Sequence, residues 1–201
     1  MTAKEMKIKT FSLIEEYYPE RTELADDQDV IYKINGVINS IMLDLMKYRK
    51  IPAKYSYTLN ENNKTLALSS IPDFYQLNTI PDIEYNVVGN IEIIFNTEDL
   101  ELPKEITIYY YKYPSLMDLT FEATSTQTKE EVSAEYDESF EIELDLDLQE
   151  IMPYGIASDL LKNDMISGYG RYFYERYSEL KGLIDSRKTQ SMAIITGGID
   201  L

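Results

Sequence analysis

The chain has 201 residues and a net charge of −17, from 19 basic and 36 acidic side chains. It contains no histidine and no cysteine, which excludes a Cys or His nucleophile, a His general base, a Cys/His zinc site and any disulfide. The net charge disfavours nucleic-acid binding, and no apolar run approaches the length of a membrane span.

The first fifty residues predict two helices. One spans residues 3–18, with Thr2 placed to cap it and Glu5 completing a capping box three residues later. Pro19 ends this helix. The second spans residues 27–49 and has a wide apolar stripe at helical spacing. The stripe consists of Val30, Ile31, Ile34, Val37, Ile38, Ile41, Met42, Leu45 and Met46.

From residue 53 the apolar period changes to two, which predicts β-strands. Residues 53–59 and 65–69 are expected to form a hairpin around a turn at residues 60–63. The further predicted strands are residues 83–88, 91–95, 105–111 and 140–146. Gly89-Asn90 predicts a tight turn, and the strict alternation of residues 140–146 indicates an antiparallel sheet with one wet face. The Thr-, Ser- and Glu-rich residues 120–139 predict a long loop or arm.

Helical spacing returns at Leu148 and predicts a short helix, with Pro153 tolerated near its first turn. Gly168 and Gly170 mark a break, after which residues 169–186 predict an amphipathic helix. Residues 188–201 have no helical stripe. They predict an extended apolar tail that pairs either with its own sheet or with a partner's.

These elements predict an α+β fold. A helical bundle is expected from the N-terminal and C-terminal helix pairs, residues 1–50 and 148–187, because helices of this length must bury their stripes on each other. Residues 51–147 are expected to form an inserted antiparallel β-rich lobe, followed by an extended docking tail at residues 188–201.

Two residue types invite a functional interpretation. Eighteen tyrosines include Tyr109-Tyr110-Tyr111 on one strand, and these three cannot all enter one core because successive strand residues face opposite sides. They indicate either a half-exposed sheet or a contact between subunits. Glu143, Asp145 and Asp147 would suit a metal site or a solvated acidic face. We favour the solvated face, because no glycine-bearing calcium loop surrounds them.

Several segments resemble the head-to-tail connector proteins of tailed bacteriophages, also called adaptor or head-completion proteins. The C-terminal residues read LQEIMPYGIASDLLKND (148–164), ISGYGRYFYERYSELKGLID (166–185) and SMAIITGGIDL (191–201), and the Tyr-rich strand reads EITIYYYKYP (105–114). The similarity is strongest to the connector proteins of phages that infect Gram-positive bacteria. It covers roughly half of the chain, and its motifs are compositional.

The resemblance implies a non-enzymatic virion protein of the phage neck, assembled in the host cytoplasm. It implies a homo-oligomeric ring of twelve copies, bound to the portal protein and to the next neck or tail protein, through which DNA passes without specific binding. No membrane, cofactor, metal or catalytic residue is expected. The expected portal-docking tail consists of Met192, Ile194, Ile195, Gly197, Gly198, Ile199 and Leu201. The expected subunit-interface residues are Tyr109, Tyr111, Tyr113, Tyr169, Tyr172, Tyr174 and Arg176.

Other functions fit parts of the sequence. Another neck or tail completion protein would belong to the same class, although such proteins more often have a compact β-barrel without long flanking helices. A cytoplasmic module whose β-rich lobe binds a protein or glycan is weakened by the missing tryptophan. A carboxylate-based hydrolase stays open, but the sequence has no phosphate loop and no nucleophile elbow.

Overall fold

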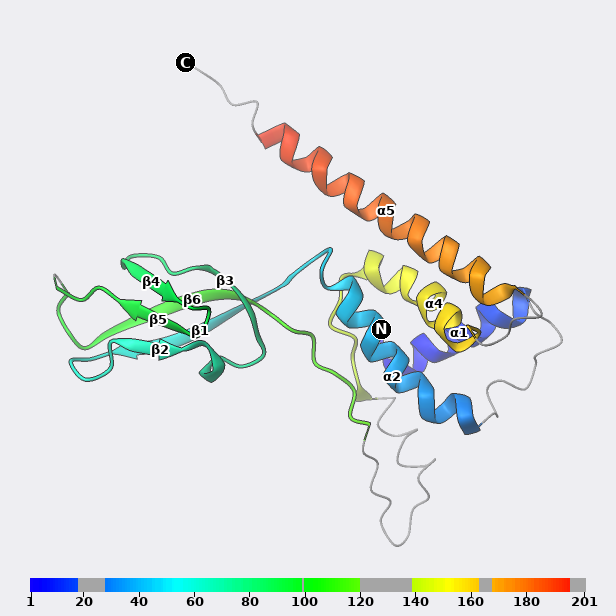
Figure 1. Ribbon diagram of the computed structural model, residues 1–201, viewed down its shortest axis with the longest axis horizontal. Coiled ribbons are helices and arrows are strands. Elements are labelled where there is room, and N and C mark those ends of the chain that lie inside the picture. Colours follow the sequence, from blue (N-terminus) through cyan, green and yellow to red (C-terminus); the bar gives the residue numbers. More distant parts are fainter. Residues whose placement is uncertain (18–27, 99, 120–138, 163–167, 196–201) are drawn as a thin grey trace, which may run out of the picture. The chain divides into compact units, whose positions relative to one another are not determined.

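The computed structural model describes residues 1–17, 28–98, 100–119, 139–162 and 168–195. Over these residues it combines four α-helices with two antiparallel sheets, which confirms the α+β class (Figure 1). The chain divides into two compact units. The helical unit comprises Met1–Arg49 and Leu116–Leu201, and the β unit is Lys50–Ser115. The β-rich lobe predicted from the sequence ran to residue 147, whereas the described residues after Ser115 belong to the helical unit.

The helical unit is centred on helix α4, which packs against the other three helices. The helices are α1 (Ala3–Tyr17), α2 (Gln28–Leu45), α4 (Leu146–Leu160) and α5 (Tyr169–Ile195). One buried cluster joins residues from both ends of the chain: Ile14, Ala157, Leu161 and Phe173. Helix α2 belongs to the same unit, and two residues of its predicted apolar stripe, Ile38 and Met42, are fully inaccessible to solvent.

The predicted capping box is confirmed at the start of α1. The Thr2 amide donates to the Glu5 carboxylate at 2.9 Å, and the Glu5 amide donates to the Thr2 hydroxyl at 3.2 Å. Two of the amides that a helix N-terminus leaves unpaired are thereby satisfied.

The strand predicted for residues 140–146 is wrong, although its alternation is real. Ile142 and Leu144 are buried while Glu141 is exposed. The segment meets the first residues of the chain in an isolated bridge, Thr2 with Glu141, and the Gln149 amide nitrogen donates to the carbonyls of Ile142 and Leu144. These side-chain bonds replace those that a partner strand would provide, and Leu146 begins α4 instead of ending a strand.

The C-terminal helices are longer than predicted. Because α4 begins at Leu146, Pro153 lies in its interior and not near its first turn. Gly168 has a φ of +68°, which favours glycine, directly before α5 begins. We predicted an extended tail from residue 188, but α5 remains helical to Ile195. Extending an existing helix adds a hydrogen bond per residue without a new nucleus, so the local β preference of Ile194 and Ile195 does not stop it.

The β unit contains two three-stranded antiparallel sheets, ordered β1-β6-β3 and β2-β5-β4. The strands are β1 (Ile51–Leu59), β2 (Thr65–Ala67), β3 (Phe74–Thr79), β4 (Tyr85–Val88), β5 (Glu92–Phe95) and β6 (Lys104–Lys112), with a short 3-10 helix η1 (Leu68–Ser70) after β2. Its core is one apolar cluster: Leu59, Leu66, Leu68, Ile71, Ile80, Ile93, Phe95, Ile106, Ile108 and Tyr110.

The hairpin predicted for residues 53–69 is wrong in its pairing. Asn60 and Asn63 do close a turn, but β1 pairs along its whole length with β6, and β2 pairs with β5. The tight turn at Gly89-Asn90 is confirmed: φ is +59° at Gly89 and +53° at Asn90, and a two-residue type I′ hairpin turn requires positive φ at both positions. Strand β3 was not predicted, because register shifts interrupt its pairing with β6 and blur its alternation.

Candidate functional site

Two of the three acidic residues considered as metal ligands, Asp145 and Asp147, form ion pairs with Arg49. Arg49 donates to Asp145 Oδ2 at 3.2 Å and to Asp147 Oδ1 at 3.0 Å. This bridge ties the chain after α2 to the start of α4, where Asp147 also suits the positive end of the helix dipole. Among the residues that the structure describes, no group of three or more acidic side chains could hold a metal ion.

The outer face of the β1-β6-β3 sheet presents tyrosine to solvent. Along β6, Ile106, Ile108 and Tyr110 point into the core, so Tyr109 and Tyr111 occupy the opposite face. Tyr109 is 43% exposed. The expectation that the three consecutive tyrosines face different sides is thus confirmed.

Two lysines flank these tyrosines. The Lys50 ammonium lies 5.1 Å from the centre of the Tyr111 ring and donates to Gln76 Oε1 at 2.6 Å. Lys54 is exposed on β1 directly opposite Tyr109. We call this surface the tyrosine face, and it comprises Lys50, Lys54, Gln76, Thr79, Tyr109 and Tyr111. Large aromatic area beside a cation is typical of protein-binding surfaces.

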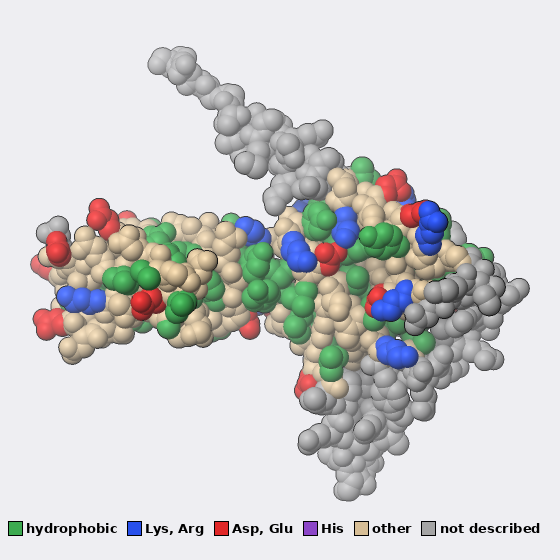
Figure 2. All heavy atoms as spheres, viewed as in Figure 1, with side chains coloured by type: hydrophobic (Ala, Val, Ile, Leu, Met, Phe, Trp, Pro, Cys, Tyr) green, Lys and Arg blue, Asp and Glu red, His purple; other side chains and the backbone are tan. Residues whose placement is uncertain are grey.

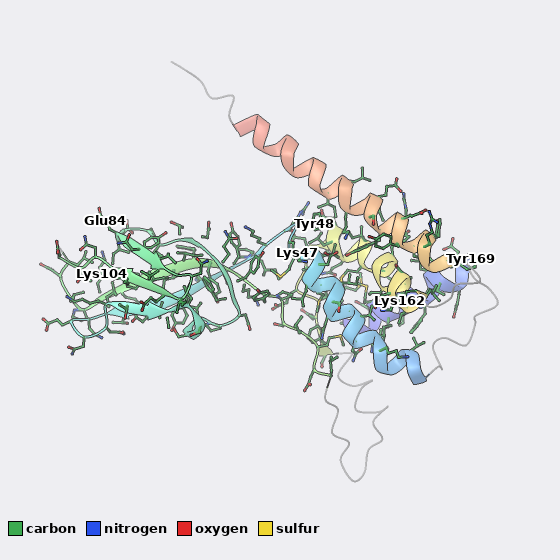
Figure 3. All side chains as sticks on the ribbon, in the orientation of Figure 1. Lys47, Tyr48, Glu84, Lys104, Lys162 and Tyr169 are labelled. Carbon is green, nitrogen blue, oxygen red and sulfur yellow. The ribbon has the colours of Figure 1, made fainter. Side chains whose placement is uncertain are left out.

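A second surface of the β unit is acidic. Asp82 and Glu84 line a shallow depression of about 450 Å³. Glu84 and Glu98 line a second depression of about 550 Å³ that shares Ile83 and Asn96 with the first. The Asn96 amide donates to the Glu84 carboxylate at 3.3 Å, and the Asn96 backbone amide donates to the Glu84 carbonyl at 2.9 Å, which hold this rim in place. We call it the acidic ledge. Figure 2 shows several acidic side chains, with a basic one among them, at the left-hand end of this unit, and Figure 3 labels Glu84 and Lys104 there.

The predicted interface residues divide between the two units. Tyr109, Tyr111 and Tyr113 belong to the β unit, where the Tyr113 ring meets Tyr75 edge-on at 5.0 Å. Tyr169, Tyr172, Tyr174 and Arg176 lie on α5. Tyr174 is 61% exposed, Tyr169 packs on the helical core, and Arg176 is paired with Glu179 at 2.6 Å.

A polar cluster that the sequence did not reveal fixes α5 to the C-terminal end of α2. The Tyr177 hydroxyl and the Lys181 ammonium both donate to Asp44 Oδ2, at 3.0 and 2.7 Å. Lys181 also lies over the rings of Tyr177 and Tyr48, and Figure 3 labels Tyr48 and Lys47 at this end of α2. Burial raises the pKa of the Asp44 carboxyl, but the hydrogen bonds from Lys181 and Tyr177 outweigh it, and the net shift is downward.

The predicted docking tail is described only in part. Met192, Ile194 and Ile195 lie on the last turn or two of α5. The other four tail residues, Gly197, Gly198, Ile199 and Leu201, lie outside the described residues. None of the helices described in the structure is long and apolar enough to cross a bilayer.

No family model matches the chain. A tRNA(Met) cytidine acetate ligase of Fusobacterium nucleatum subsp. nucleatum is 33% identical to it over 111 residues. The similarity covers 51% of this chain and 26% of the ligase, so the chain spans about a quarter of the length of this curated relative.

Proposed function

We propose that the chain is a structural subunit of a phage neck ring, which joins the portal of the DNA-filled head to the tail and continues the DNA channel. The observation that carries this proposal is the division of the chain. Both chain ends contribute to one helical unit, and the β unit is inserted between Arg49 and Leu116. The connector resemblance of residues 105–114 and 148–201 implies the same plan, a helical bundle with a β insertion.

The charge of the chain suits this role. A channel that DNA traverses must not retain it, and a subunit with a net charge of −17 repels phosphate. In the proposed ring the N-terminal and C-terminal helix pairs share one core, which the buried contact of Ile14 with Ala157 and Phe173 supports. The protein is a component of the virion neck, assembled in the host cytoplasm.

The finer part of the proposal concerns the C-terminal tail. Met192, Ile194 and Ile195 on the end of α5, with residues 196–201 beyond it, dock on the portal. Many identical attachments around one ring strengthen each other, so a weak single contact gives lasting attachment.

Co-assembly with the portal protein encoded in the same genome tests this function. We expect closed rings seated on the portal in electron micrographs of the mixed proteins. A chain lacking residues 191–201 is expected to keep its circular dichroism spectrum and to lose the portal. Full-length protein that never associates with the portal would refute the neck role, and a truncated protein that still attaches would refute the docking tail alone.

The similarity to the ligase favours a second candidate, acetate transfer onto cytidine of tRNA(Met). The physical case against it is the charge of −17 and the absence of a glycine-rich phosphate loop from the sequence. Incubation with tRNA, labelled acetate and a nucleoside triphosphate separates the two. Labelled tRNA, lost on substitution of a single carboxylate, would establish the ligase candidate and overturn the neck subunit.

A further inference from the structure

We propose that the tyrosine face of one copy docks on the acidic ledge of a second copy, head to tail. The inference deepens the proposed ring, and so rests on it, by naming the surfaces through which neighbouring β units meet. It begins from charge. Lys50 lies over the Tyr111 ring and Lys54 lies opposite Tyr109. The ledge presents three carboxylates, Asp82, Glu84 and Glu98, and one cation, Lys104, beside Asp82. One β unit therefore carries two patches of opposite sign.

The two patches lie at opposite ends of strand β6. At its beginning, the Lys104 ammonium donates to the Asp82 carbonyl at 3.2 Å, which places the ledge beside that end. Tyr111 is next to its last residue, Lys112. Tyr109, which lies opposite Lys54, is five steps from Lys104, and Tyr111 is seven, which corresponds to roughly 17 and 23 Å along a strand. Within one β unit the patches are too far apart to neutralise each other, so their complementarity is available only between copies.

This separation also determines the kind of contact. Two different patches on one rigid unit pair heterologously, because the face of each copy uses the ledge of the next and leaves its own ledge open. Such contacts continue until the ring closes, whereas a self-complementary patch would stop at a dimer. The large, rigid tyrosine side chains supply contact area at low entropic cost. The charges of the two lysines orient the approaching copy and raise the rate at which the two copies associate.

A second copy is the occupant that the charges favour. The chain has 36 acidic and 19 basic side chains, so another copy presents carboxylates far more often than cations. Nucleic-acid phosphates and a second copy are both repelled at long range by the net charge of −17. The second copy is favoured because it adds tyrosine contact area to the local pairing of Lys50 and Lys54 with carboxylates.

Charge reversal on one patch at a time tests the pairing. The full-length protein is examined by sedimentation velocity as Lys54→Glu, as Glu84→Lys, and as a one-to-one mixture of the two. The salt concentration is about 0.15 M, which screens the long-range repulsion between two chains of net charge −17 beyond about 8 Å. Each variant alone places like charges at the contact, and we expect self-association to weaken about tenfold or more. In the mixture every contact again joins opposite charges, so association is expected to return to the wild-type level.

Two controls make the result specific. Lys162→Glu makes the same charge change on the helical unit, and Tyr109→Ser removes aromatic area without changing charge. We expect Lys162→Glu to associate like wild type and Tyr109→Ser to associate more weakly. Wild-type protein that stays monomeric at every concentration, or variants whose mixture gains nothing, would overturn the interface. If rings still form on the portal in that case, the proposed neck function survives and only this contact is wrong.

Discussion

Single residues at the end of α2 determine where α5 lies. Asp44 accepts hydrogen bonds from Tyr177 and Lys181, which come from 133 and 137 residues further along the chain. Burial raises the pKa of the Tyr177 hydroxyl, and the negative charge of Asp44 raises it further, so Tyr177 stays a neutral donor. Gly155 leaves room for the same ring, since an added Cβ would lie 3.0 Å from it. The packing of the Tyr177 ring and the hydrogen bonds to Asp44 therefore hold α5 against α2 at the same place.

The hydroxyl of Tyr177 can be removed without removing its ring. We expect Tyr177→Phe to lower the free energy of unfolding by about 1–2 kcal/mol, because the Asp44 carboxylate loses a donor while the packing stays. Tyr174→Phe is the matched control, since Tyr174 is 61% exposed. Urea denaturation measures both. Equal stability of the two variants would show that the hydrogen bond contributes nothing.

The lowered pKa of Asp44 makes its contribution dependent on pH. Because the folded-state pKa lies below the unfolded value of about 3.9, the stabilisation is complete above about pH 5 and is lost as the pH falls through the folded-state pKa. The difference in Tm between wild type and Asp44→Asn is therefore expected to be constant near neutrality and to shrink in acid. A difference that grew on acidification would contradict the assigned shift.

At the scale of elements, two glycines of α5 differ in the space available for a side chain. A Cβ on Gly170 would lie 2.6 Å from the Leu161 carbonyl oxygen, a backbone atom that cannot move aside, whereas a Cβ on Gly182 meets nothing within 4 Å. We expect Gly170→Ala to destabilise the protein and Gly182→Ala to stabilise it by about 0.5–1 kcal/mol, the usual gain of alanine over glycine in a helix. Thermal unfolding measures both. Two shifts of the same sign would refute the close approach of α5 to the end of α4.

The elements that could be predicted from sequence are those specified by neighbouring residues. The capping box at Thr2, the stripe of α2 and the Gly89-Asn90 turn depend on spacings of a few residues, and the structure has all three. Strand pairing depends on distant residues, so the partner of β1 could not be read locally. The same applies to the surfaces: the outward position of Tyr109 follows from alternation, but its lysine neighbour follows from the register with β1. The acidic ledge forms only when the residues around β4 and β5 come together.

At the scale of the whole molecule, the helical unit is expected to unfold as one. Ile38 on α2 and Leu161 after α4 are both buried, and each comes from a different end of the chain. Aspartate at either position buries an unpaired charge at a cost of several kcal/mol, which is comparable to a typical total stability of about 5–15 kcal/mol. Ile38→Asp and Leu161→Asp should therefore each abolish the helical circular dichroism signal.

Ile8→Asp is the control for this loss, because Ile8 is 55% exposed on α1. It is expected to change stability by no more than about 1 kcal/mol. A Leu161→Asp protein that melted like wild type would show that the chain ends do not share a core, and would remove the main support for the proposed neck subunit.

The net negative charge of the chain repels DNA as a whole, and in the proposed ring every subunit contributes the same charge. A duplex carries one phosphate charge for about every 1.7 Å of its length. A chain with 36 acidic and 19 basic side chains repels these phosphates, and salt only partly screens the repulsion. We expect no shift of duplex DNA in a mobility assay at about 0.15 M salt, for the free chain and for the assembled ring alike.

A variant with Lys50 and Lys54 both changed to Glu serves as the comparison, since these lysines form the basic part of the tyrosine face. Salt-sensitive binding by the wild type that this variant loses would identify the tyrosine face as a DNA contact and contradict a passive channel.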